Sequence, residues 1–100
     1  MENTQVNIVQ KANKWLVSGP ILMETANKLL LDSGALAITA HAHDIDLLNV
    51  TEVDTAAISL MMEWQRRAAT VKSKVTFSNL PDNLTSLAAL YGVTEFIPLS

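Results

Sequence analysis

The stretch Ile45-Asp46-Leu47-Leu48-Asn49-Val50-Thr51-Glu52-Val53-Asp54-Thr55-Ala56-Ala57 decides the fold of this chain. Its apolar start predicts a strand from Asp44 to Leu48 that is buried on both faces, as in a sheet covered by helices. A tight loop is expected after this strand, followed by a helix over about residues 55–71. Asp54 and Thr55 at the helix start can satisfy backbone N–H groups, and the Thr55 hydroxyl lies at the positive end of the helix dipole. This helix start is therefore the candidate chemical site.

The residues on either side predict an α/β chain. Two short strands, near Val6–Ile8 and Trp15–Val17, are expected to form a hairpin. Helical spacing begins at Leu22 and stops near Ser33-Gly34, and residues 35–41 match no pattern. A further strand is predicted over 75–77, a helix with Pro81 in its first turn, and a short strand at 96–97. The last helix is expected to bury Leu84, Leu87, Ala88 and Tyr91 and to end at Gly92.

The central helix has an apolar arc wide enough to face both a sheet and a neighbouring helix. With Ile58 as its centre, the arc contains Met61, Met62, Gln65, Ala68 and Ala69, flanked by Ala57, Leu60, Trp64 and Val71. The opposite stripe contains Thr55, Ser59, Glu63, Arg66 and Thr70. The pattern predicts that this polar stripe, led by Thr55, faces outward and is open to a partner.

Composition limits the function classes. One hundred residues fit one domain over 1–100, and a net charge of −3 with a pI of about 5.1 gives no electrostatic support for nucleic-acid binding. The chain has no cysteine, which excludes disulfides and thiol chemistry. Its polar start is unlike a signal peptide, and no apolar run reaches the roughly 18 residues of a spanning helix. We expect a soluble protein without direct membrane insertion.

Other candidate sites are weaker. His41 and His43 are two apart on a possible strand and could share a metal ion, but no third ligand stands at a diagnostic spacing. Asp44 and Asp46 resemble an acid–base pair without an accompanying nucleophile, and no phosphate-binding loop occurs. We therefore predict no catalytic residue, no metal and no cofactor, which makes the protein a non-enzyme.

The central stretch resembles the central strand and switch loop of STAS domains, the fold of bacterial anti-sigma factor antagonists. Within that superfamily, the chain is most similar to the MlaB-like subfamily, the small STAS subunits of Mla phospholipid-transport ABC complexes. The motifs that carry this likeness are Glu63-Trp64-x-Arg66-Arg67-Ala68, Phe77-x-Asn79-Leu80-Pro81 with its following leucines, and Gly92-Val93 before Pro98-Leu99. Family members usually carry glycine where Ala57 stands, and residues 35–43 match poorly. The resemblance implies a single STAS domain with a mixed sheet of about four to five strands.

The resemblance also implies a function and a partner. Such subunits bind the cytoplasmic ATPase of the transporter (an MlaF-like subunit), which works with an inner-membrane permease. Carried over by position, Thr55 is the contact residue and Asp54 lies beside it, with Ala56, Ser59 and Glu63 around it. This places the protein in the cytoplasm, peripheral to the inner membrane. The alternative is an anti-sigma factor antagonist that is switched by phosphorylation at Thr55 and binds an anti-sigma kinase.

Overall fold

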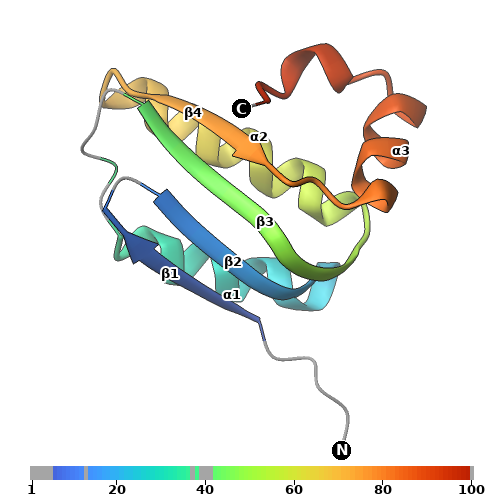
Figure 1. The fold of residues 1–100 in the computed structure, drawn as a ribbon, viewed down its shortest axis with the longest axis horizontal. Coiled ribbons are helices and arrows are strands. Elements are labelled where there is room, and N and C mark those ends of the chain that lie inside the picture. Colours follow the sequence, from blue (N-terminus) through green and yellow to red (C-terminus); the bar gives the residue numbers. More distant parts are fainter. Residues whose placement is uncertain (1–5, 13, 37, 39–41, 100) are drawn as a thin grey trace, which may run out of the picture.

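Four strands form one mixed sheet in the computed structural model, which describes residues 6–12, 14–36, 38 and 42–99 (Figure 1). The strands are β1 (Asn7–Lys11), β2 (Lys14–Ile21), β3 (Ala42–Val53) and β4 (Lys74–Ser78), and they lie in the order β1-β2-β3-β4. β1 pairs antiparallel with β2, whereas β2, β3 and β4 run parallel. The predicted hairpin and the predicted α/β class are both confirmed.

Helices connect the parallel strands and cover one face of the sheet. α1 (Met23–Gly34) and α2 (Thr55–Thr70) lie behind the sheet in Figure 1, and α3 (Asp82–Leu90) packs against α2 and the end of β3. α1 ends at Gly34, as predicted. α3 is followed by Gly92 at a φ of +68°, with the Val93 N–H donating to the Ala88 carbonyl at 2.9 Å, which is a helix C-terminus that favours glycine.

β3 differs from its prediction in two ways. It continues to Val53, so the segment expected as a tight loop is strand, and the chain turns only at Asp54. The register between β2 and β3 shifts twice, because three β3 residues span two β2 residues at each shift. Each bulge turns the next apolar residue back toward the core after two exposed positions in a row. Two exposed positions in a row break the alternation of a strand, so in the sequence this segment resembles a loop.

The prediction that β3 is buried on both faces is wrong. Ile45 and Leu47 are fully buried, whereas Leu48 is 66% exposed. Within the described residues, α1 and α2 cover the face on which Trp15, Ile45 and Phe77 are fully buried. On the other face, the side chains of Asp44 and Asp46 are only partly exposed and bind neighbouring polar groups.

α2 has the predicted length but is rotated relative to its predicted orientation. Its buried residues are Ala57, Leu60, Met61, Trp64 and Ala68, whereas Ile58 and Met62 are half-buried and Val71 is exposed. The centre of the buried arc therefore lies about 100° from Ile58, the predicted centre, which is one residue step around the helix. α2 meets both α1 and the sheet, as predicted, but the side that it buries there is the flank of the apolar arc with Leu60 and Trp64. The outward position of Thr55 and Ser59 is confirmed.

The C-terminal segment does not form the predicted strand at Phe96-Ile97. Residues Thr94–Phe96 form a short 3-10 helix, η1, and the buried Ile97 follows it. The sheet edge is reached later, where the Phe77 N–H donates to the Pro98 carbonyl at 2.9 Å and Leu99 forms one isolated bridge. Pro81 precedes α3 as its N-cap, and Tyr91, predicted to be buried, is 57% exposed.

Candidate functional site: a groove between two helix starts

Parallel pairing places the starts of α1 and α2 side by side. Ile21 at the end of β2 lies in register with Val53 at the end of β3, and each strand leads into its helix within two residues. The Asp54 N–H donates to the Ile21 carbonyl at 3.2 Å, which closes this edge of the sheet. Carboxyl ends of parallel strands are the common place for binding sites in α/β folds.

Asp54 is the N-cap of α2, as predicted, and it also binds α1. Its backbone is extended, and its Oδ1 accepts the Ala56 N–H at 2.8 Å. Its Oδ2 accepts the Met23 N–H, at the first residue of α1, at 3.0 Å. One carboxylate therefore serves two helix starts, a role that the sequence alone did not indicate.

Four of the five predicted site residues line a groove between α1 and α2. The groove has a volume of about 510 Å³. Its α2 side consists of Thr55, Ala56, Ser59, Leu60 and Glu63, and its α1 side consists of Met23, Ala26, Asn27 and Leu30. Asp54 does not line the groove, because its carboxylate is turned to the backbone N–H groups at the helix starts.

The α1 residues were missed by sequence reasoning. The helical spacing that begins at Leu22 places Ala26 and Leu30 on one face of α1, and the structure leaves both half-buried at the groove. Met23 is 75% exposed, a large apolar side chain open to solvent at the first position of its helix. The sequence signal that could have found these residues is the strand–helix–strand order, which is typical of parallel strands whose helices begin at the same end of the sheet.

Glu63 supplies the charge on the groove wall. Arg66 donates to it from one turn further along α2, through both Nε and Nη2. This hydrogen bond, helped by the charges of Arg66 and Arg67, holds the pKa of the Glu63 carboxyl below its usual range. Glu63 is therefore an ionised acceptor at neutral pH, already paired with a cation on its own helix.

The far end of the α1–α2 pair is closed by polar contacts. Arg67 donates to the carbonyls of Ser33 and Leu36, at 2.9 and 3.2 Å. Trp64 donates through Nε1 to the Ser33 hydroxyl at 2.9 Å in the buried layer between the helices. The Arg67 guanidinium also lies 5.7 Å from the centre of the Trp15 ring, within reach of a cation–π contact.

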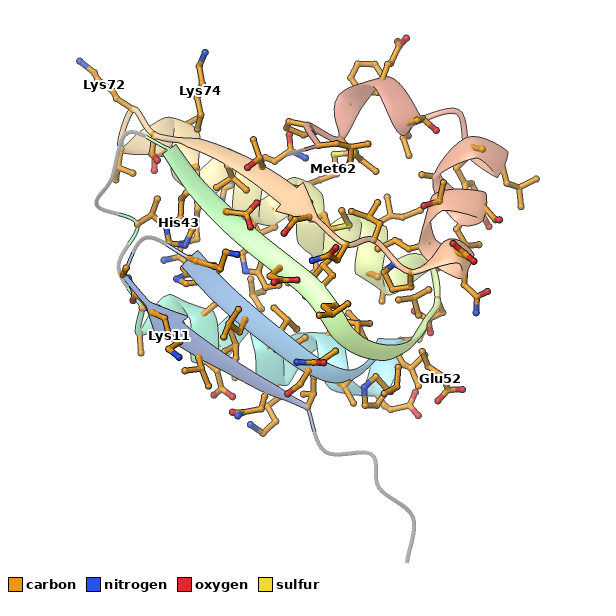
Figure 2. All side chains as sticks on the ribbon, viewed as in Figure 1. Lys11, His43, Glu52, Met62, Lys72 and Lys74 are labelled. Atoms are coloured by element: carbon orange, nitrogen blue, oxygen red, sulfur yellow. The ribbon has the colours of Figure 1, made fainter. Side chains whose placement is uncertain are left out.

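The metal hypothesis can be followed in the structure only through His43 and its neighbours. His43 is 1% exposed on the helix-covered face, whereas Asp44 belongs to the open face, and His41 lies outside the described residues. Within the described ranges, no three histidine, aspartate or glutamate side chains could hold a metal ion. Figure 2 shows His43 where β3 begins, far from Glu52 near the helix starts.

His43 is instead a core residue. Its ring stands edge-on to Trp15 with centroids 4.8 Å apart, and its Nε2 has no hydrogen-bond partner within the described structure. Burial lowers the pKa of the imidazole below 6.5, with the charge of Asp44 acting in the opposite direction. A neutral imidazole in an apolar layer is a packing group rather than a ligand.

Comparison with known proteins identifies the fold. A protein-family profile described as "Mlab, STAS domain" matches residues 5–99. A search of curated protein sequences finds no match. Within the described residues, no helix is long and apolar enough to cross a membrane.

Solved structures with the same fold have low sequence identity to this chain. The unphosphorylated anti-sigma factor antagonist SpoIIAA superposes with a TM-score of 0.71 at 9% identity, over 96% of this chain and 88% of that one. A sulfate transporter family protein from Wolinella succinogenes gives 0.67 at 16% identity, over 85% and 70%. An RsbS variant from Moorella thermoacetica gives 0.59 at 15% identity, over 96% and 86%. Together with the family match over residues 5–99, this fold places the chain in the family of Mlab-type STAS domains.

Proposed function

We propose that this protein is a non-catalytic STAS subunit that binds and supports the cytoplasmic ATPase of a bacterial phospholipid-transport (Mla-type) ABC transporter. The family match supports the class of protein, since STAS domains are generally interaction or regulatory domains. The observation that carries the proposal is the groove, because Thr55, Ala56, Ser59 and Glu63 line it together. Through the ATPase and its permease partner, the subunit is held at the inner membrane.

The chemistry of the groove suits a helix or loop of another protein. Ala26, Ala56 and Ser59 are small, so a partner backbone can approach closely. Met23 is 75% exposed and Leu30 is half-buried, which offers apolar surface for a partner side chain. A mixed apolar and polar surface of this kind is typical of protein interfaces, in which a few central residues dominate the binding energy.

Thr55→Glu tests the proposal directly. Thr55 is exposed at the first position of α2, where an acidic side chain is compatible with the helix dipole, so the variant should fold. In the interface, the added carboxylate would be desolvated in the groove without a partner, which commonly costs several kcal/mol. Co-purification with the ABC ATPase, followed by titration, should show a loss of affinity of at least about tenfold, or about 1.4 kcal/mol.

Thr85→Glu is the matched control. Thr85 is another exposed threonine on a helix, but it belongs to α3 and lies outside the groove. Circular dichroism of each free protein separates folding from binding. ATPase binding that is equal for wild type, Thr55→Glu and Thr85→Glu would remove Thr55 from the interface.

A switch controlled by phosphorylation is the second candidate function. It is favoured by the exposure of the Thr55 hydroxyl at a helix start, where backbone N–H groups and the dipole attract a phosphate. In that case, the partner captured from cells would be an anti-sigma kinase, and phosphate would be found on Thr55 by mass spectrometry. Capture of an ATPase and a permease, with unmodified Thr55, would favour the transporter subunit.

A further inference from the structure

α1 does not satisfy its own ends. Its N-cap position is Leu22, whose side chain offers no hydrogen-bond acceptor, and its last turn contains no basic residue. The Thr25 hydroxyl accepts from the Leu22 N–H and donates to the Pro20 carbonyl. The Met23 N–H therefore takes its acceptor from outside α1. This end of α1 is open to solvent, so water is the alternative partner of the Met23 N–H.

α2 supplies the missing groups at both ends of α1. Asp54, the N-cap of α2, accepts the Met23 N–H, although 31 residues separate the two in sequence. Arg67, in the last turn of α2, donates to the carbonyls of Ser33 and Leu36 at the end of α1. An anionic group meets the positive end of the α1 dipole and a cationic group meets its negative end, so both contacts have the favourable sign.

We propose that Asp54 and Arg67 form a two-ended clamp that fixes α1 against α2 and so sets the shape of the groove. They are positioning residues, since their charged groups contact α1 backbone instead of the groove interior. The Trp64 indole, which donates to the Ser33 hydroxyl, stiffens the same end as Arg67. The consequence for partner binding rests on the proposed function, whereas the clamp itself is a property of the free domain.

Asp54→Ser separates the clamp from ordinary helix capping. Serine is a good N-cap and can still accept the Ala56 N–H, but its single short hydroxyl cannot also serve Met23. Amide hydrogen exchange, measured by NMR, should become at least about fivefold faster at Met23 and change much less at Ala56. The matched control is Asp82→Ser, which removes an exposed acidic residue from the start of α3 and should leave Met23 exchange unchanged.

Arg67→Met tests the other end. Methionine keeps most of the apolar stem but removes the guanidinium, so amides in the last turn of α1 should exchange at least about fivefold faster. Lys74→Met, at an exposed position on β4, is the control for loss of a positive charge. If Asp54→Ser does not fold, Asp54→Asn replaces it, because its amide has only one acceptor oxygen for the two N–H groups.

The outcomes distinguish the clamp from the proposed function. Unchanged exchange at Met23 in Asp54→Ser, or at the end of α1 in Arg67→Met, would overturn the clamp. Where exchange rises, affinity for the ABC ATPase should fall at least about fivefold in both folded variants, and unchanged affinity would overturn the positioning role. If wild-type protein does not bind the ATPase, the proposed function fails, and the exchange rates alone then decide on the clamp.

Discussion

The two faces of the sheet carry the same strands but have opposite chemistry. On the covered face, Trp15, Ile45 and Phe77 pack under α1 and α2 and are fully buried. On the open face, Lys14 lies 3.8 Å from both Asp44 and Asp46, and β4 contributes hydroxyl donors to Asp44. Stability is therefore concentrated on the covered face, whereas the open face is held by solvent-accessible polar contacts that are individually weak.

The difference also explains where the candidate site lies. The groove is formed by the outer sides of the two covering helices, which are fixed to the sheet by their buried sides. The carboxylates of the open face are already occupied: Asp44 accepts the hydroxyls of Thr76 and Ser78, and Asp46 accepts the Asn79 amide and the Leu48 N–H. Groups satisfied in this way are less available to a ligand than the exposed Thr55 and Ser59.

Leu47 and Leu48 are neighbours in sequence and give the largest expected contrast between the faces. Leu47 is fully buried, whereas Leu48 is 66% exposed. Leu47→Ala should lower the free energy of unfolding by about 2–5 kcal/mol, because it leaves a cavity in the core. Leu48→Ala should change it by no more than about 0.5 kcal/mol. Urea denaturation of both variants measures the difference, and equal costs would mean that the assigned faces of β3 are wrong.

Local sequence patterns predict part of this fold and miss the part that depends on strand register. The hairpin, the α2 length and the turn at Gly92 follow from alternation, helical spacing and a glycine at positive φ, which are local signals. The extension of β3 to Val53 was missed because its bulges break the alternation, and bulges depend on register with β2. Local signals cannot contain this information, since register is set by a strand 30 residues away.

The candidate site was predictable on one side only. Thr55, Ser59 and Glu63 recur on one face of a helix, so their common outward position follows from helical geometry. The contribution of Met23 and the double role of Asp54 depend on two helix starts that meet in space. Contact of α2 with both the sheet and a neighbouring helix was predicted, but which side of its wide apolar arc is buried depends on where α1 lies.

The response to acid should differ between the two faces, beginning with His43 on the covered face. Burial lowers its pKa, so the unfolded chain binds a proton at higher pH than the folded domain does. Its stabilising contribution is present above about pH 6.5, the ordinary histidine value, and is lost as the pH falls below it. Unfolding free energies measured between pH 7.5 and 5.5 should fall for wild type and fall less for His43→Leu. Parallel curves would exclude His43 as the responsible group.

The open face should respond only in stronger acid, through Asp46. Burial acts to raise its pKa, but hydrogen bonds from Asn79 and the Leu48 N–H, with the charge of Lys14, outweigh this and lower it. Its stabilising contribution is therefore present above the ordinary value of 3.8 and is lost as the pH falls through the lower folded value. Asp46→Asn should flatten the stability curve below about pH 4 without changing the response near pH 6.5.

Lys14→Met should give the smallest effect. The Lys14 side chain is 45% exposed and its ammonium lies 3.8 Å from each carboxylate, so water and salt screen both pairs. Removing it leaves Asp44 with its two hydroxyl donors and Asp46 with its amide and backbone donors, so neither carboxylate becomes unpaired. We expect a loss of about 0–1 kcal/mol in unfolding free energy that shrinks further near 1 M salt. A loss above about 2 kcal/mol that persists in salt would show that this network is shielded from water. The two faces of the sheet would then differ in the chemistry of their side chains but not in their access to solvent.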